Sequence, residues 1–135
     1  MLARLRNALD HERGESMVEF ALVLPVLLLV LIGVVQFALI HHAQNVATTA
    51  AQEGARLAAE EGGQPLDGEM RARDVLRSGL GQTAETFEVT AADTGETVSL
   101  QATGSYPLIL PWFGGGGIEI EASTEMMKEG FRSGP

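Results

Sequence analysis

Apolar and polar residues follow three different patterns along this chain, and each pattern predicts a different element. Residues 20–40 form one apolar run, FALVLPVLLLVLIGVVQFALI, in which Gln36 is the only strongly polar side chain. A helix of 21 residues rises about 1.5 Å per residue and so spans about 30 Å, the thickness of a bilayer's hydrocarbon core. The run therefore predicts a membrane-spanning helix at 20–40.

Helical periodicity continues beyond the apolar run. Small apolar residues recur there at spacings of three and four: Ala43, Val46, Ala47, Ala50, Gly54, Leu57 and Ala58. We expect one long helix over residues 15–61, with a kink at Pro25 and an end at the pair Gly62 and Gly63, which suits a left-handed cap. The stripe of small residues favours close packing, either on the chain's own domain or on similar helices of other copies.

The rest of the chain predicts a small mixed domain. Residues 65–80 form a short helix whose apolar face would hold Ala72, Val75, Leu76 and Leu80, with Asp67 as its cap. From Thr86 the period changes to two, and two strands flank a turn at 93–96; a third strand starts at Ile118. The fold class is therefore α+β: a long amino-terminal transmembrane helix that extends into an exported domain with a short helix and a small three-stranded antiparallel sheet.

The same patterns divide the chain into segments. Residues 1–14 are short, polar and able to form at most a turn or two of helix. The long helix takes residues 15–61, the exported domain residues 62–130, and a disordered tail residues 131–135. The prolines and glycines of YPLILPWFGGGG indicate a flexible loop. Its aromatic pair, Trp112 and Phe113, either folds back on the sheet or contacts a partner.

Charge sets the expected orientation. Arg4, Arg6 and Arg13 precede the apolar run and no Lys or Arg follows it until Arg56, so the amino end should face the cytoplasm. Residues 41–135 hold six Lys or Arg against fourteen Asp or Glu, a net charge of −8. An acidic exported part disfavours nucleic acid as a partner. A secretory signal peptide is the rival interpretation, but its apolar region would be shorter, about 7–15 residues.

Candidate chemistry is sparse. The chain has no cysteine, and His41 and His42 are adjacent, so they project about 100° apart on a helix and form no pair of metal ligands. The four glycines at 114–117 lack the Lys and Ser/Thr of a phosphate-binding loop. No catalytic constellation is supported by residue spacing, so we expect a non-enzyme that has no metal or cofactor.

Glu19 is the one carboxylate at the edge of the apolar run, where it makes insertion less favourable by a few kcal/mol at most. It lies in RGESMVEFALVLPVLLLVLIG, which is followed by AQNVATTAAQEGARLAA. These residues resemble the amino-terminal half of the TadE-like proteins, minor pseudopilins of the tight-adherence type IV pilus system. The ending ASTEMMKEG also resembles the carboxy-terminal strand of that family.

The resemblance implies a pilus function. A prepilin peptidase would cut between Gly14 and Glu15, and Glu19 would then set register during assembly by pairing with the new amino group. Implied partners are this peptidase, other minor pseudopilins, the major Flp-type pilin and the platform in the inner membrane, where the chain would be a single-pass protein with its domain outside. Two alternatives stay open: an uncleaved single-pass anchor that binds a ligand or acts as a scaffold, and an anchored exported enzyme.

Overall fold

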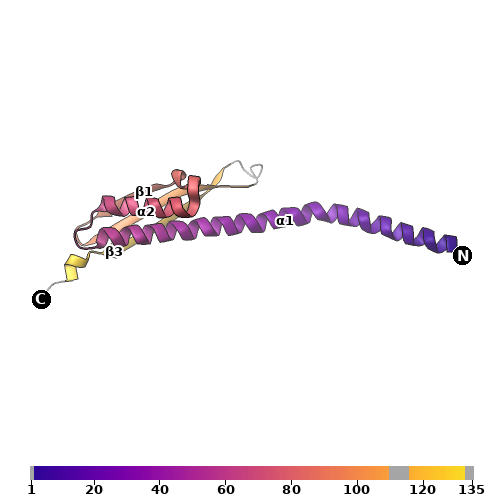
Figure 1. The fold of residues 1–135 in the computed structure, drawn as a ribbon, viewed down its shortest axis with the longest axis horizontal. Helices are drawn as coiled ribbons and strands as arrows, with labels where there is room; N and C mark the ends of the chain where they lie inside the picture. Colours follow the sequence, from indigo (N-terminus) through magenta and orange to yellow (C-terminus); the bar gives the residue numbers. More distant parts are fainter. Residues whose placement is uncertain (1, 110–115, 133–135) are drawn as a thin grey trace. The chain divides into compact units, whose positions relative to one another are not determined.

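The computed structural model describes residues 2–109 and 116–132, with side chains for residues 14–109 and 116–130. The chain forms two compact units, Met1–Phe37 and Ala38–Pro135. Helix α1, Leu2–Ala59, runs through both of them (Figure 1). Each unit is described by itself below.

The first unit is the amino-terminal part of α1. The helix begins at Leu2 and not at the expected Glu15, so residues 2–13 are helical where at most a turn or two was predicted. The reason is that this segment is rich in the helix formers Leu, Ala and Arg, and lengthening an existing helix needs no new nucleus. Pro25 lies inside the helix, and a kink there stays a prediction.

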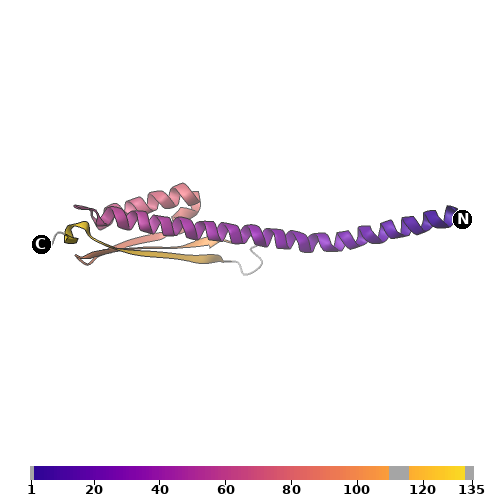
Figure 2. The ribbon, with the colours of Figure 1, turned by 90° about the horizontal axis from the view of Figure 1, so that it is seen from below.

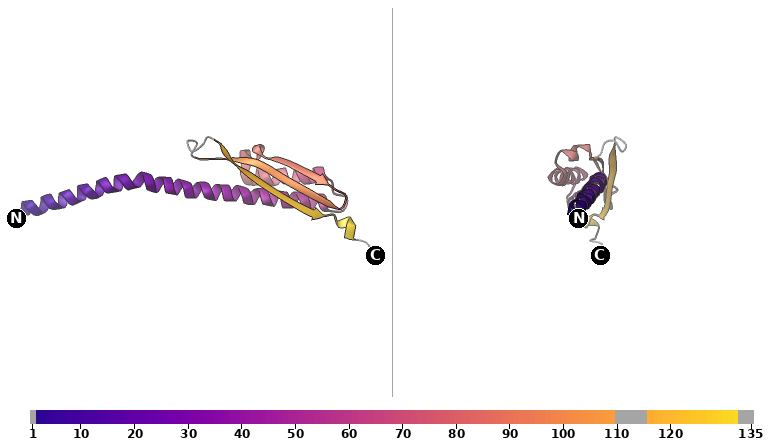
Figure 3. Two further views of the ribbon diagram at one scale, coloured as in Figure 1. Left: turned by 180° about the vertical axis from the view of Figure 1, so that it is seen from behind. Right: turned by 90° about the vertical axis from the view of Figure 1, so that its right-hand side faces the viewer.

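The second unit has two layers. Residues 38–59 of α1 and helix α2, Pro65–Leu80, cover one face of a three-stranded sheet (Figures 2 and 3). The strands are β1, Glu88–Asp93, β2, Thr97–Pro107, and β3, Gly117–Met127; they pair antiparallel in the order β1-β2-β3. Two short 3₁₀ helices, η1 at Gly81–Thr86 and η3 at Glu129–Arg132, follow α2 and β3. The predicted α+β fold class is confirmed.

The core is built from small residues on α1 and larger ones on the sheet. Ala43, Ala47 and Ala50 of α1 are fully buried, as the small-residue stripe predicted, whereas Leu57 at the end of the stripe is 36% exposed. Opposite them, the strands contribute Val89, Val98, Leu100, Ala102, Ile120 and Ala122 to the buried set. The strands alternate buried and exposed positions, so the other sheet face is wet, as expected for an antiparallel sheet covered on one side.

Two glycines set how closely α1 and α2 approach. A Cβ added at Gly54 would lie 2.5 Å from the carbonyl oxygen of Gly68 and 2.6 Å from Leu100 Cδ1; one added at Gly68 would lie 2.6 Å from the Gly54 carbonyl oxygen. Since a real Cβ contact is never that short, neither site has room for a side chain. The two helices pack backbone against backbone here, which is what small residues at a crossing permit.

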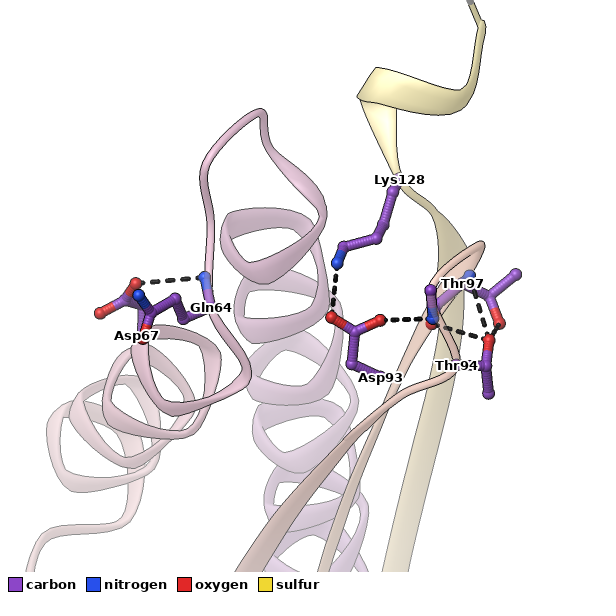
Figure 4. Close-up of polar contacts among 7 residues, drawn as sticks. Gln64, Asp67, Asp93, Thr94, Thr97 and Lys128 are labelled. Carbon is purple, nitrogen blue, oxygen red and sulfur yellow. Dashed lines mark hydrogen bonds and ion pairs between the residues drawn. The ribbon is translucent and has the colours of Figure 1, made fainter.

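The start of α2 is capped in a way that differs from the prediction. Gln64 is the N-cap residue, and Asp67 lies at the third helical position, where its Oδ2 accepts the Gln64 backbone N–H at 3.2 Å (Figure 4). Asp67 thus caps the helix from inside it, as the acidic member of a capping box. Helix α1 ends at Ala59, two residues earlier than predicted, and Gly62 follows with the expected positive φ of 80°.

An ion pair joins the carboxy-terminal end of β3 to the turn between β1 and β2. Lys128 Nζ donates to Asp93 Oδ2 at 2.5 Å, and Asp93 Oδ1 accepts the Gly95 backbone N–H at 2.7 Å (Figure 4). The bond from Lys128, followed by the bond from Gly95, lowers the pKa of Asp93 below its usual value. The two side chains are about a quarter exposed, at 26% and 24%.

Candidate functional site

The candidate processing and register residues lie on one uninterrupted stretch of α1. Gly14, Glu15 and Glu19 are all helical and all exposed. The role assigned to each of them from the sequence stays a prediction, but their spacing follows from the helix. Glu15 and Glu19 are four residues apart and therefore share one face, with an axial separation of about 6 Å.

Glu19 is surrounded by exposed apolar side chains. Met17, Phe20 and Leu22 are 75%, 63% and 71% exposed, which is unusual for large apolar residues. Beyond Glu19, the sequence contains no Asp, Glu, Lys or Arg until Glu53. Among residues 14–109 and 116–130, no side chain forms a hydrogen bond or ion pair with the Glu19 carboxylate. Among the described side chains, Glu19 is thus a charge without a partner at the start of an apolar helix.

Gly14 has open space around it. A Cβ added there would meet no heavy atom within 4 Å, so its backbone is accessible from that side. The glycine is helical, however, and a peptidase needs an extended backbone at the bond that it cuts. Glycine weakens a helix by about 1 kcal/mol relative to alanine, which makes local unwinding at this point less costly than elsewhere.

The other residues singled out from the sequence contribute less. Trp112 and Phe113 lie outside the described residues. His42 Nε2 lies 3.3 Å from the Gly79 carbonyl oxygen and so joins α1 to the end of α2. Within the part of the chain that the structure describes, no group of three or more His, Cys, Asp or Glu side chains is placed to hold a metal ion.

Sequence patterns did not reveal a groove of about 420 Å³ between the end of α1 and the start of α2. Its lining comes from both helices and from the turn that joins them, and the sequence pattern of either helix gives no sign of such a groove. Glu60, Glu61 and Met70 are among the side chains that line it.

The geometry first defines a class of protein. The segment Gly14–Ala59 contains a stretch long and apolar enough to cross a membrane, and none of that stretch is buried inside the structure. Joined to an α+β unit, it indicates a membrane-anchored protein with a folded domain beyond the anchor.

The comparisons add a family likeness over part of the chain. The family model described as TadE-like protein matches residues 14–56, about a third of the chain. The resemblance found in the sequence is confirmed over these residues, and it indicates involvement in the tight-adherence pilus system. The match begins at Gly14 and includes Glu19 and the whole apolar run. Comparison with curated proteins and with solved structures gives no match.

Proposed function

We propose that this chain is a non-catalytic minor pseudopilin, cut by a prepilin peptidase between Gly14 and Glu15 and required for the assembly or initiation of a tight-adherence, Flp-type pilus. The observation that carries the proposal is the TadE-like match that starts at Gly14 and extends to residue 56. The matched range includes Gly14, Glu19 and the whole apolar run, which supports the proposal.

Cleavage would supply a partner charge for Glu19. A new amino terminus at Glu15 would place an ammonium group one helical turn from the Glu19 carboxylate, on the same face of α1. In a low-dielectric setting this attraction is much stronger than in water. The amine belongs either to the same chain or to a neighbouring subunit, and in the second case the pair sets the register of adjacent helices.

The remaining parts of the chain then take consistent roles. The apolar helix holds the protein in the cytoplasmic membrane as a single span, with its amino end inside because the arginines Arg4, Arg6 and Arg13 precede the span. The α+β unit lies outside and contacts the other minor pseudopilins, the major pilin or the membrane platform. The small-residue stripe is not free for those contacts, because Ala43, Ala47 and Ala50 are already buried in the unit's own core.

The test is to compare Glu19→Ala with Glu15→Gln in the native host. We expect Glu19→Ala to be inserted and cut normally but to lower the amount of pilus at least tenfold, because removing one partner of a desolvated pair costs about 3 kcal/mol or more. Glu15→Gln removes a charge one turn away but keeps the new amine, so pili should form normally. Pili are counted by electron microscopy, and processing is followed by mass.

Two results would overturn the proposal. Normal piliation in Glu19→Ala would remove the register role. Equal loss of piliation and of cleavage in both variants would show that the two carboxylates serve peptidase recognition and not assembly.

A further inference from the structure

The groove at the end of α1 is lined in part by apolar side chains that stay exposed. It is lined by Leu57 at the end of the small-residue stripe and by Met70 on α2, together with the turn at 60–63. Leu57 is 36% exposed and Met70 is 53% exposed, whereas the alanines further back on the same stripe are completely buried. Apolar side chains left open inside a concave site are typical of binding grooves.

Four carboxylates also line the groove, and most of them have no partner among the described residues. Glu60, Glu61, Asp67 and Asp74 line it. Asp67 accepts one backbone N–H from Gln64, and within the described part of the chain the carboxylates of the other three form no hydrogen bond or ion pair.

The other charges at the groove do not neutralise its carboxylates. Among the described residues that line it, Arg71 is the cation, and it is already held by Glu53, with Nη2 3.3 Å from Oε2. The groove lies between the carboxy-terminal end of α1 and the amino-terminal end of α2, where the two helix dipoles have opposite signs and offset each other. The carboxylates of Glu60, Glu61 and Asp74 therefore decide the sign, and they favour a positively charged occupant.

A second copy of this chain is a poor occupant. Residues 41–135 carry six Lys or Arg against fourteen Asp or Glu, so two copies of the exported part repel each other. Among the described side chains, Arg71 pairs with Glu53, Arg77 with Glu85 and Lys128 with Asp93, so these cations are already in use. The complementary charge is more readily supplied by a different chain.

We propose that this groove docks a segment of a different protein that carries an apolar side chain flanked by Lys or Arg. The apolar side chain fills the space over Leu57 and Met70, and the basic residues meet Glu60, Glu61 and Asp74. Apolar contact supplies most of the affinity, and the charges select the partner and orient it. The inference goes beyond the proposed function: it depends neither on cleavage at Gly14 nor on Glu19, and its test is separate.

The wet face of the sheet offers a control surface inside the same molecule. It is also acidic, since Glu119, Glu121 and Glu125 are exposed along β3. Their cross-strand partners on that face are Ser105, Thr103 and Ser99, so this face presents no large apolar side chain at these positions. Charge alone would make this face and the groove equivalent.

The experiment uses the full chain in detergent micelles, labelled for NMR, and three blocked tetrapeptides, KLLK, KSSK and ELLE. We expect KLLK to shift the Met70 methyl resonance and the Gly62 and Gly63 amide resonances in a saturable way that weakens as salt rises. KSSK, which lacks the apolar side chains, and the acidic peptide ELLE should leave these resonances unchanged. The double variant Glu60→Gln/Glu61→Gln should weaken KLLK binding about tenfold, since it removes two exposed ion pairs, each of which contributes modestly.

The matched control is Glu119→Gln/Glu121→Gln, which removes the same charge from the wet sheet face and should leave KLLK binding unchanged. Three results would overturn the proposal. The first is that KLLK leaves the groove resonances unchanged. The second is that KSSK binds as well as KLLK and both double variants are equally weakened. The third is that the same resonances shift on concentrating the protein alone, which would make a second copy the occupant.

Discussion

The part of α1 in the first unit exposes large apolar side chains, whereas the part in the second unit buries small ones. Phe20, Leu22 and Phe37 are 63%, 71% and 73% exposed. Ala47 and Ala55, on the same helix, are completely buried. Along one continuous helix, the apolar side chains therefore change from large and exposed to small and buried.

This difference reflects two surroundings. Large apolar side chains that point outward are stable only where the solvent is itself apolar, and the backbone of such a helix is satisfied internally. Small apolar side chains that point inward let a second helix and a sheet approach closely, as at Gly54 and Gly68. The comparison thus separates a segment made for lipid from a segment made for a protein core.

The largest expected effect comes from charging the lipid-facing part. Val30→Arg/Leu31→Arg changes two side chains that are 59% and 58% exposed. Each arginine near the middle of a span costs about 3 kcal/mol of insertion, so the pair costs about 6 kcal/mol. We expect the variant to be lost from the membrane fraction after alkaline extraction. Leu66→Arg/Met127→Arg, at sites 62% and 65% exposed in the second unit, should stay in that fraction; equal behaviour of the two variants would contradict the assignment.

The second prediction uses one substitution in both parts of the helix. Gly54→Ala forces a Cβ against the Gly68 carbonyl oxygen and Leu100, and the strain should destabilise the second unit by about 1–3 kcal/mol. Gly33→Ala meets no heavy atom within 4 Å and should be neutral or slightly stabilising. The measurement is the urea concentration at which half of the protein is unfolded, monitored in the full chain through the NMR signals of the second unit. A neutral Gly54→Ala variant would show that the helices do not approach so closely.

Much of this fold could be predicted from the sequence, because its periods are clear. The short helix has the predicted bounds, Pro65–Leu80, since a proline starts it and the apolar residues recur at helical spacing. The helical state of residues 2–13 was missed because it depends on the adjoining helix and not on the segment itself. The Lys128 and Asp93 pair and the acidic groove join residues distant in sequence, which no local pattern reports.

The candidate site divides in the same way. Glu19 could be selected because a charge beside a long apolar run is conspicuous in any sequence. Gly14 and Glu15 were selected only through the resemblance to the TadE-like proteins. Trp112 and Phe113, proposed as a partner contact, lie outside the described residues, so that role stays a prediction. The predicted tail at 131–135 also stays a prediction, although its first two residues belong to η3.

The smallest expected effect concerns the ion pair of the second unit. The fold lowers the pKa of Asp93, so its contribution to stability is fully present above the unfolded pKa of about 3.9 and is lost as the pH falls through the lower, folded value. Asp93→Asn should therefore lower the urea midpoint at pH 7, and the difference from wild type should shrink below about pH 4. Glu96→Gln, in the same turn, is the control. A difference that stays constant down to pH 2 would contradict an ionic role.

The measurement that tests the account most directly is the intact mass of the protein purified from its native membrane, beside Gly14→Ala and a host that lacks the prepilin peptidase. The account predicts a loss of residues 1–14 in the wild type and full-length protein in both controls. Full-length protein in all three samples would contradict processing and leave an uncut anchor. Loss of the whole apolar run would contradict a retained membrane helix and make the segment a signal peptide.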